Sequence, residues 1–128
     1  ETELKRIRAS VYSNEKQLET VIATRNFIES NFDKELNLEL LAHLRFTSKY
    51  HLLRLFKKYY GITPKQYLIE QRILKSKEQL GQGMSVTETC FAVGFESLGS
   101  FSALFKAKTG KSPSEYQKEQ LSRSKLMR

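Results

Sequence analysis

A repeat with an offset of 49 residues constrains this chain more than any other feature of its sequence. The stretch 52–67 combines the end of one helix pattern with the start of another, and the same pattern returns at 101–116. Both copies contain Leu-Phe-Lys, then a glycine, a hydroxyl residue followed by proline, and a tyrosine. A solenoid needs at least three repeats, so two copies predict a protein with two equivalent binding units.

Each copy places apolar side chains at the spacing of one helix face. The positions related by steps of three and four are Leu52, Leu55, Phe56 and Tyr59 in the first copy, and Phe101, Leu104 and Phe105 in the second. This spacing predicts a helix that turns one stripe toward the core of the protein.

A stop signal and a start signal follow each stripe. Gly61 and Gly110 lie where the helices are expected to end, because glycine tolerates the left-handed conformation of a helix C-terminus. The stretches 63–66 and 112–115 each begin with a hydroxyl residue and place Gln or Glu three residues later, with proline at the first helical position. This is the pattern of a capping box, so a new helix is expected just past each glycine.

The rest of the chain extends the pattern to an all-α fold. Helices are predicted over residues 15–31, 38–44, 49–60, 64–80, 86–93 and 98–109, and from 113 into the 120s. No stretch alternates at period two, so no strand is predicted. The seven helices are expected to form two homeodomain-like helix-turn-helix subdomains joined by a long linker helix. The predicted boundaries are a charged linker or tail, helical or irregular, at 1–14, the first subdomain with its linker helix at 15–80, the second at 81–121 and a basic tail at 122–128.

The charge balance favours a polyanionic partner. Lys and Arg number 22 against 14 Asp and Glu, a formal net charge of +8. Nucleic acid or an anionic membrane surface fits this excess, and a solvated basic surface is the plainer alternative. No run approaches the roughly 18 apolar residues of a membrane span. The single cysteine, Cys90, gives no internal disulfide and fits the reducing cytoplasm. The chain starts with Glu1 instead of Met, as a piece of a longer protein would.

Few residues offer catalytic or metal chemistry. His43 and His51 fall in different predicted helices, without an acidic or thiol companion at ligand spacing, so no metal site is expected. Cys90 occupies a position that suits a small apolar side chain, which favours a buried structural cysteine over a nucleophile. The chain has no glycine-rich phosphate loop and no recognisable carboxylate pair. We therefore expect neither an enzyme nor a cofactor.

The helix over 49–60 carries a second stripe opposite its core stripe. A recognition helix uses such a face on base edges in the major groove. Arg54 can make a bidentate contact to guanine, while Tyr50 and Leu53 can meet thymine methyl groups. Packing of Leu53 on a neighbouring helix is an equally weighted alternative, and Lys57 and Lys58 suit phosphate contacts. The predicted DNA-binding residues of the first unit are Ser48, Lys49, Tyr50, Leu53, Arg54, Lys57 and Lys58.

The equivalent face of the second unit is small and almost uncharged. Such a surface can approach DNA closely but offers few donors for reading bases, so backbone positioning and apolar contact are expected. The predicted DNA-binding residues of the second unit are Ser97, Leu98, Gly99, Ser100, Ser102, Ala103 and Lys106.

Taken together, the motifs over about residues 18–120 resemble the DNA-binding domain of AraC/XylS-type transcriptional regulators. The resemblance rests on Leu-x-x-Leu-Phe-Lys-Lys with its Gly, Pro and Tyr at 52–67, on Val-Gly-Phe-Glu-Ser at 93–97 and on the second Phe-x-x-Leu-Phe-Lys at 101–106. Arg72 also fits the family pattern. Three differences stand out: Phe46 replaces the usual glycine of the first turn, Cys90 replaces an alanine, and the second recognition face lacks the polar and Arg residues of many members.

The resemblance implies sequence-specific binding of double-stranded promoter DNA for bacterial transcription regulation, with two recognition helices in adjacent major grooves, about 34 Å apart on one side of the domain. It also implies contact with RNA polymerase in many members, and an effector or dimerisation domain that lies outside this chain. Two alternatives remain open: a non-specific nucleic-acid or RNA binder, and a protein-interaction module that retains the fold. A third, the regulatory half of a DNA-repair methyltransferase, would need a cysteine-rich zinc module that this chain lacks.

Overall fold

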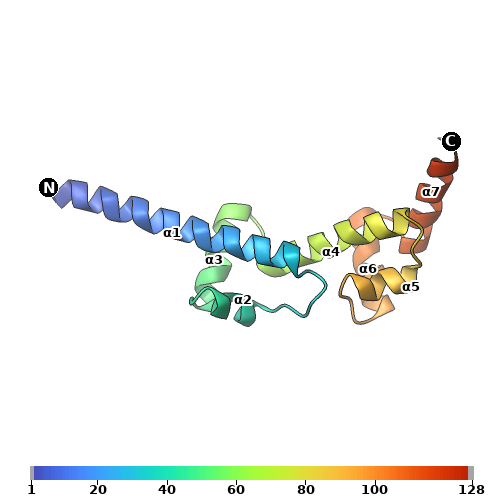
Figure 1. Ribbon diagram of the computed structural model, residues 1–128, viewed down its shortest axis with the longest axis horizontal. Helices are drawn as coiled ribbons and strands as arrows, with labels where there is room; N and C mark the ends of the chain where they lie inside the picture. The colour runs from blue at the N-terminus through green and yellow to red at the C-terminus, as the bar shows by residue number, and fades with distance from the viewer. Residues whose placement is uncertain (1, 127–128) are drawn as a thin grey trace. The chain divides into compact units, whose positions relative to one another are not determined.

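A computed structural model describes residues 2–126 of the chain. These residues form seven α-helices and no strand, which confirms the predicted all-α class. The helices labelled in Figure 1 are α1 (Thr2–Ser30), α2 (Leu38–Leu44), α3 (Lys49–Tyr60), α4 (Pro64–Gly81), α5 (Val86–Ala92), α6 (Leu98–Thr109) and α7 (Pro113–Leu126). Within this part of the chain, no helix is both long enough and apolar enough to cross a membrane.

Polar caps fix where most of these helices begin. In the capping box before α4, the Gln66 N–H donates to Thr63 Oγ1 at 3.1 Å, and the Thr63 N–H donates to Gln66 Oε1 at 2.9 Å. Each such bond satisfies a backbone N–H that has no partner inside the helix. Single caps of the same kind, in which a side chain accepts the N–H three residues on, are made by Asn37, Ser48, Ser85 and Ser97.

The first helix extends beyond its predicted apolar stripe. α1 begins at Thr2, whereas the stripe is expected from about Glu15, with a linker or tail before it that could itself be helical. The apolar side chains in the additional turns, Leu4, Ile7 and Val11, are exposed. They therefore form no stripe against the chain's own core, which is the feature that usually reveals a helix in a sequence.

The described residues divide into two compact units by their contacts. The first contains the chain up to Asn31 together with Leu36–Leu68. Both α1 and α2 pack on α3 in this unit, and Val21, Ile28, Leu52 and Phe56 are fully buried. α3 therefore turns its apolar stripe inward, as predicted, and leaves its opposite side uncovered by α1 and α2.

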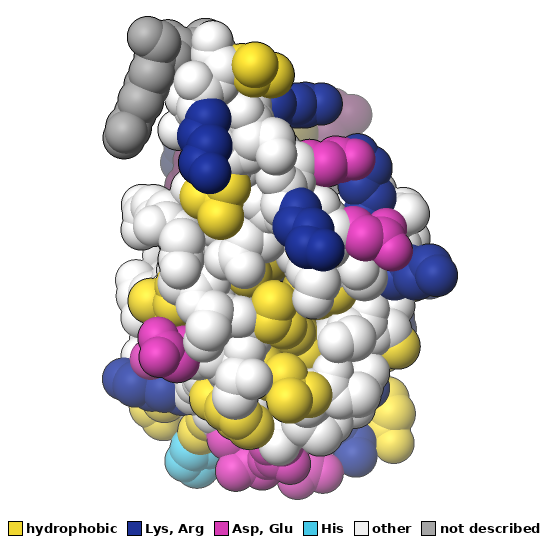
Figure 2. Space-filling model, turned by 90° about the vertical axis from the view of Figure 1, so that its right-hand side faces the viewer, with side chains coloured by type: hydrophobic (Ala, Val, Ile, Leu, Met, Phe, Trp, Pro, Cys, Tyr) yellow, Lys and Arg dark blue, Asp and Glu magenta, His cyan; other side chains and the backbone are white. Residues whose placement is uncertain are grey.

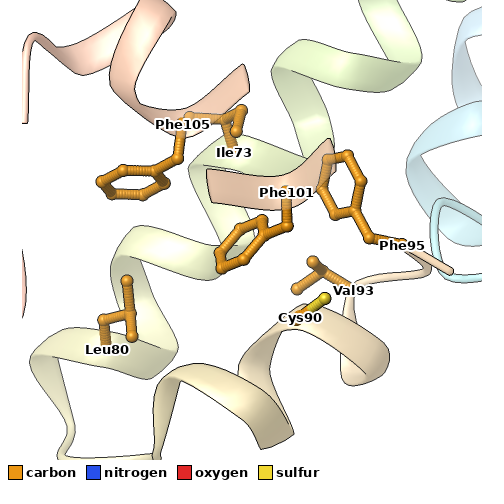
Figure 3. Close-up of a cluster of buried hydrophobic side chains, with 7 residues drawn as sticks. All are labelled: Ile73, Leu80, Cys90, Val93, Phe95, Phe101 and Phe105. Atoms are coloured by element: carbon orange, nitrogen blue, oxygen red, sulfur yellow. The ribbon is translucent and has the colours of Figure 1, made fainter. Parts of the chain in front are cut away.

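The second unit contains Phe32–Glu35 and the chain from Ile69 onward. Its core, drawn in Figure 3, combines side chains from α4, α5, α6 and the turn between the last two: Ile73, Leu80, Cys90, Val93, Phe95, Phe101 and Phe105. Phe32 packs against this cluster from the segment that precedes α2. The guanidinium of Arg72 holds the same segment, because Nε donates to the Phe32 carbonyl at 2.7 Å and Nη2 to the Lys34 carbonyl at 2.8 Å.

The turns of the two helix-turn-helix pairs follow one hydrogen-bond pattern. In the first, the N–H groups of Phe46 and Thr47 donate to carbonyls of α2; in the second, those of Gly94 and Phe95 donate to the equivalent carbonyls of α5. Gly94 has a positive φ of 101°, and Phe46, at the matching position, has a positive φ of 54°. The left-handed turn is thus preserved where a phenylalanine replaces the glycine.

Candidate nucleic-acid interface

The predicted recognition face of α3 is open to solvent. Ser48 caps the helix by accepting the His51 N–H at 3.1 Å, which fixes the first turn. Opposite the buried stripe, Tyr50 is 67% exposed, and Arg54 is exposed as well. The remaining members of the predicted set are distributed as follows: Lys57 and Lys58 are exposed, and Lys49 and Leu53 are half-buried.

Arg54 is available for contacts outside the chain. Among the described residues, no hydrogen bond or ion pair holds its guanidinium, which lies in the middle of α3. A guanidinium carries a rigid set of N–H donors that matches paired acceptors such as O6 and N7 of guanine. Among the predicted residues of α3, Arg54 therefore offers the donor group best suited to paired acceptors.

The ammonium group of Lys49 already has contacts within the protein. Its ammonium Nζ lies 3.4 Å from Oε1 of Glu39 in α2 and 5.3 Å from the centre of the Tyr50 ring. An exposed ion pair contributes little to stability, but it orients the lysine and the neighbouring ring. This contact joins two helices, so the sequence alone gives no sign of it.

The burial of Leu53 is compatible with both roles predicted for it, contact with a thymine methyl group and packing on a neighbouring helix. It is half-buried, so part of its side chain packs in the protein and part stays accessible. A half-buried leucine beside exposed Tyr50 and Arg54 can offer a small apolar contact without leaving a large exposed patch.

The equivalent face of α6 is also accessible but chemically different. Ser97 caps this helix by accepting the Ser100 N–H at 3.2 Å, and Phe101 and Phe105 bury the inner stripe. The other predicted residues lie on the outer surface: Leu98, Gly99, Ser100, Ala103 and Lys106 are exposed, and Ser102 is half-buried. Lys106 is the single charged member of this set.

The turn before α3 adds side chains outside the predicted set. Phe46 is 96% exposed, and Arg45 beside it is exposed too. An exposed phenylalanine in a left-handed turn has no role in packing. The signal in the sequence is the phenylalanine itself, at a position where a turn of this type favours glycine.

The basic excess is not gathered on the face shown in Figure 2. Figure 2 shows dark-blue Lys and Arg side chains on this face interspersed with magenta Asp and Glu side chains. Mixed charges of this kind are typical of a solvated surface, so this face adds no argument for a second polyanion site.

The described residues contain no candidate metal cluster. No group of three or more His, Cys, Asp and Glu side chains within residues 2–126 is placed to hold a metal ion. Cys90 is fully buried in the second core, as predicted, and burial raises the pKa of its thiol. A protonated thiol inside a hydrophobic cluster is a poor nucleophile.

Comparison with known proteins identifies the family. A family model described as a helix-turn-helix domain, of the AraC type, matches residues 41–119, which contain α3 and α6 together. The chain belongs to the AraC-type helix-turn-helix family. Its family resemblance, inferred from the repeated motifs, is confirmed, and members of this family are DNA-binding transcription regulators.

Relatives and solved structures of AraC type agree with the fold. The bifunctional transcriptional activator/DNA repair enzyme AdaA of Bacillus subtilis is 36% identical over 91 residues, 70% of this chain and 43% of that protein. The C-terminal domain of the response regulator AraT from Geobacillus stearothermophilus shares 29% identity at a TM-score of 0.76, covering 78% of this chain and 84% of that one. The DNA-binding domain of AdpA, solved in complex with a target DNA, shares 26% identity at a TM-score of 0.77, covering 80% and 94%.

The chain spans less than half the length of the first curated relatives it matches, 43% of AdaA and 46% of the probable transcriptional regulator LumQ of Photobacterium leiognathi. The repair activity in the name of AdaA belongs to that whole protein.

Proposed function

We propose that this chain binds specific double-stranded DNA sequences in bacterial promoters and thereby regulates transcription. In this proposal α3 and α6 enter two successive major grooves, about one helical turn of DNA apart. RNA polymerase is the proposed further partner at the promoter.

The exposed stripe of α3 carries the proposal. It combines an aromatic ring at Tyr50, a guanidinium at Arg54 and an ammonium at Lys57 on one side of a helix whose other side is buried. Base edges need such donors and apolar groups, and phosphates need the cations. A helix that is merely solvated has no need for an ordered stripe of this kind.

The two faces are assigned different roles. α3 reads bases through Arg54, with Tyr50 and Leu53 toward thymine methyl groups, while Lys57 and Lys58 neutralise phosphates. α6 lies close to the DNA through its small residues Gly99, Ser102 and Ala103, with Ser97, Leu98 and Ser100 near its entry and Lys106 on phosphate.

Selection of binding sites from a random DNA library tests the proposal directly. We expect the full chain to enrich a site with two parts whose centres lie about 10 base pairs apart. Failure to enrich any sequence would favour a non-specific binder instead.

Titration of the selected site at several salt concentrations tests the electrostatic part. Each phosphate contact releases counterions, so the logarithm of the binding constant should fall linearly with the logarithm of salt concentration. A flat response would contradict nucleic-acid binding altogether.

A protein-interaction module is the second candidate, and the small, nearly uncharged face of α6 favours it for the second unit. Hydroxyl-radical footprinting separates the two. Protection over both parts of the site supports DNA binding by α6, and protection over one part assigns α6 to another partner.

A further inference from the structure

The first five turns of α1 expose an apolar seam. Leu4, Ile7 and Val11 are 51%, 56% and 51% exposed, and Leu18 is also exposed. In Figure 1 this part of α1 projects beyond α2 and α3, while its C-terminal half packs on α3. Large apolar side chains aligned on an uncovered helix face are typical of an interaction site.

The seam has the spacing of a coiled coil. Residues Leu4, Val11 and Leu18 are seven apart, and Ile7 and Asn14 follow the first two by three residues. In heptad terms the first set occupies a positions and the second set d positions, the pattern by which two helices pack side by side. The next d residue, Val21, is fully buried in the first unit, so the seam runs directly into the folded core.

We propose that this seam pairs with the same seam of a second copy of the chain in a parallel, in-register, two-stranded coiled coil. The inference concerns an interaction surface and does not depend on DNA binding.

Charge complementarity points to a second copy as the occupant. Glu3 and Arg8 flank the seam at g and e positions, five residues apart. In a parallel pair, a g residue faces the e residue of the next heptad in the partner helix. Glu3 of each copy therefore meets Arg8 of the other, which gives two opposite-charge pairs by symmetry. Within one helix, residues five apart do not face each other, so this complementarity has no use inside a single chain.

Asn14 argues for the parallel, in-register arrangement. Identical positions of the two helices then meet, so the two amides can hydrogen-bond to each other. In an antiparallel pair a d residue faces an a residue, and every a position of the seam carries an apolar side chain: Leu4, Val11 and Leu18. The amide would then be buried without a partner, which is unfavourable.

The C-terminal end of α3 bounds the seam. Lys58 and Tyr59 line a shallow hollow beside α1 together with Val11, Asn14, Glu15 and Leu18. The uncovered part of the seam therefore ends where α3 meets α1. The exposed turns of α1 have few contacts of their own, and isolated short helices are marginal in water, so pairing should also stabilise this helical segment.

Sedimentation equilibrium of the full chain tests the pairing. We expect a dimer at high micromolar concentration, with a helical circular-dichroism signal that rises with concentration. Ile7→Asp should raise the dimer dissociation constant by at least about tenfold, because a charge replaces a buried apolar side chain in both copies. Tyr12→Asp is the matched control: Tyr12 is exposed on the outer side of the same helix, and its substitution should leave the dimer intact. A monomer at every concentration, or equal effects of the two variants, would overturn the proposal.

Cysteine cross-linking tests the orientation. In a parallel pair two copies of Val11→Cys lie face to face, so we expect a disulfide-linked dimer on oxidation, and no such dimer for Tyr12→Cys. A dimer that persists without cross-linking at position 11 would overturn the parallel arrangement.

Charge reversal provides an independent check. Glu3→Arg or Arg8→Glu alone should weaken the dimer, and the double variant should restore it. Loss of the dimer in the double variant would contradict the proposed pairing of these side chains.

Discussion

The guanidinium of Arg72 lies so close to Gly94 that a Cβ on this glycine would come within 3.0 Å of three of its atoms. Gly94→Ala must therefore accept a left-handed backbone and also displace the group that holds the Phe32 and Lys34 carbonyls. We expect a loss of about 2–4 kcal/mol of unfolding free energy. Urea denaturation measures it. Gly61→Ala is the matched control, because Gly61 has φ 77° but no atom within 4 Å of the added Cβ. A cost no greater than that of the control would contradict the close packing.

Phe46→Gly should stabilise the protein. The backbone of Phe46, at φ 54°, is sterically strained for a phenylalanine but not for a glycine. The Phe46 ring is almost fully exposed. Glycine loses more chain entropy on folding, so the expected net gain is at most about 1 kcal/mol. Phe46→Ala keeps the strain and removes only the ring, so its stability should match the wild type. Thermal unfolding of both variants gives the comparison, and a destabilised Phe46→Gly would show that the ring packs in solution.

Arg54→Ala should change which DNA sequence the chain prefers. Loss of a bidentate contact to guanine costs about 1–3 kcal/mol of discrimination and should relax the preference at one or two base pairs. Lys106→Ala should weaken binding evenly across sequences, as loss of a phosphate contact does. Arg6→Ala, on the outer side of α1, controls for loss of a positive charge.

Titration of each variant against a library of sites measures these effects. An unchanged preference in Arg54→Ala, together with a preference redefined by changes at Ser100 or Ser102, would reverse the roles assigned to α3 and α6.

Tyr67 should make stability fall at alkaline pH. Burial and the hydrogen bond that its hydroxyl donates to the Glu29 carboxylate raise the pKa of Tyr67 above its ordinary value of 10.0. The folded state therefore favours the protonated phenol. This contribution is fully present below pH 10.0 and is lost progressively as the pH rises from there through the higher folded pKa.

Tyr67→Phe removes the titrating group but keeps the ring that packs on Phe56 and Tyr60. It should cost about 1 kcal/mol at neutral pH and reduce the alkaline loss. Urea denaturation at neutral pH and above pH 10.0 tests this, and an unchanged alkaline slope would assign the loss to other groups.

Local signals explain why most of the fold is predictable from the sequence. The helix that starts at Lys49 and ends at Tyr60 has its cap, its stripe and its terminal glycine all within the segment. The start of α1 lacks such signals, because the apolar side chains of its first turns have no partner inside the chain. The heptad spacing of Leu4, Val11 and Leu18 is the available sign, but it covers little more than two heptads, too few to identify a coiled coil from a sequence alone.

The exposed positions of the candidate site follow from the core stripe, since residues opposite a buried face must be accessible. Contacts between elements do not follow in this way. Two examples are the ion pair of Lys49 with Glu39 and the hydrogen bond that Arg72 donates to the Phe32 carbonyl. Each joins segments that come together only through the tertiary packing of the helices. For the same reason, contacts place Ile73 and Leu80 of the linker helix in the second core, although the sequence groups residues 64–80 with the first subdomain.

The segment Phe32–Glu35 belongs to the second unit but is encoded between two stretches of the first. The second unit is therefore not an uninterrupted piece of the polypeptide. A fragment beginning at Ile69 would lack the ring of Phe32 against its core and would leave the donors of Arg72 without their two carbonyls. Chimaeras that exchange the second unit between relatives need to transfer this short segment with it, and a junction placed only within α4 would separate residues that fold together.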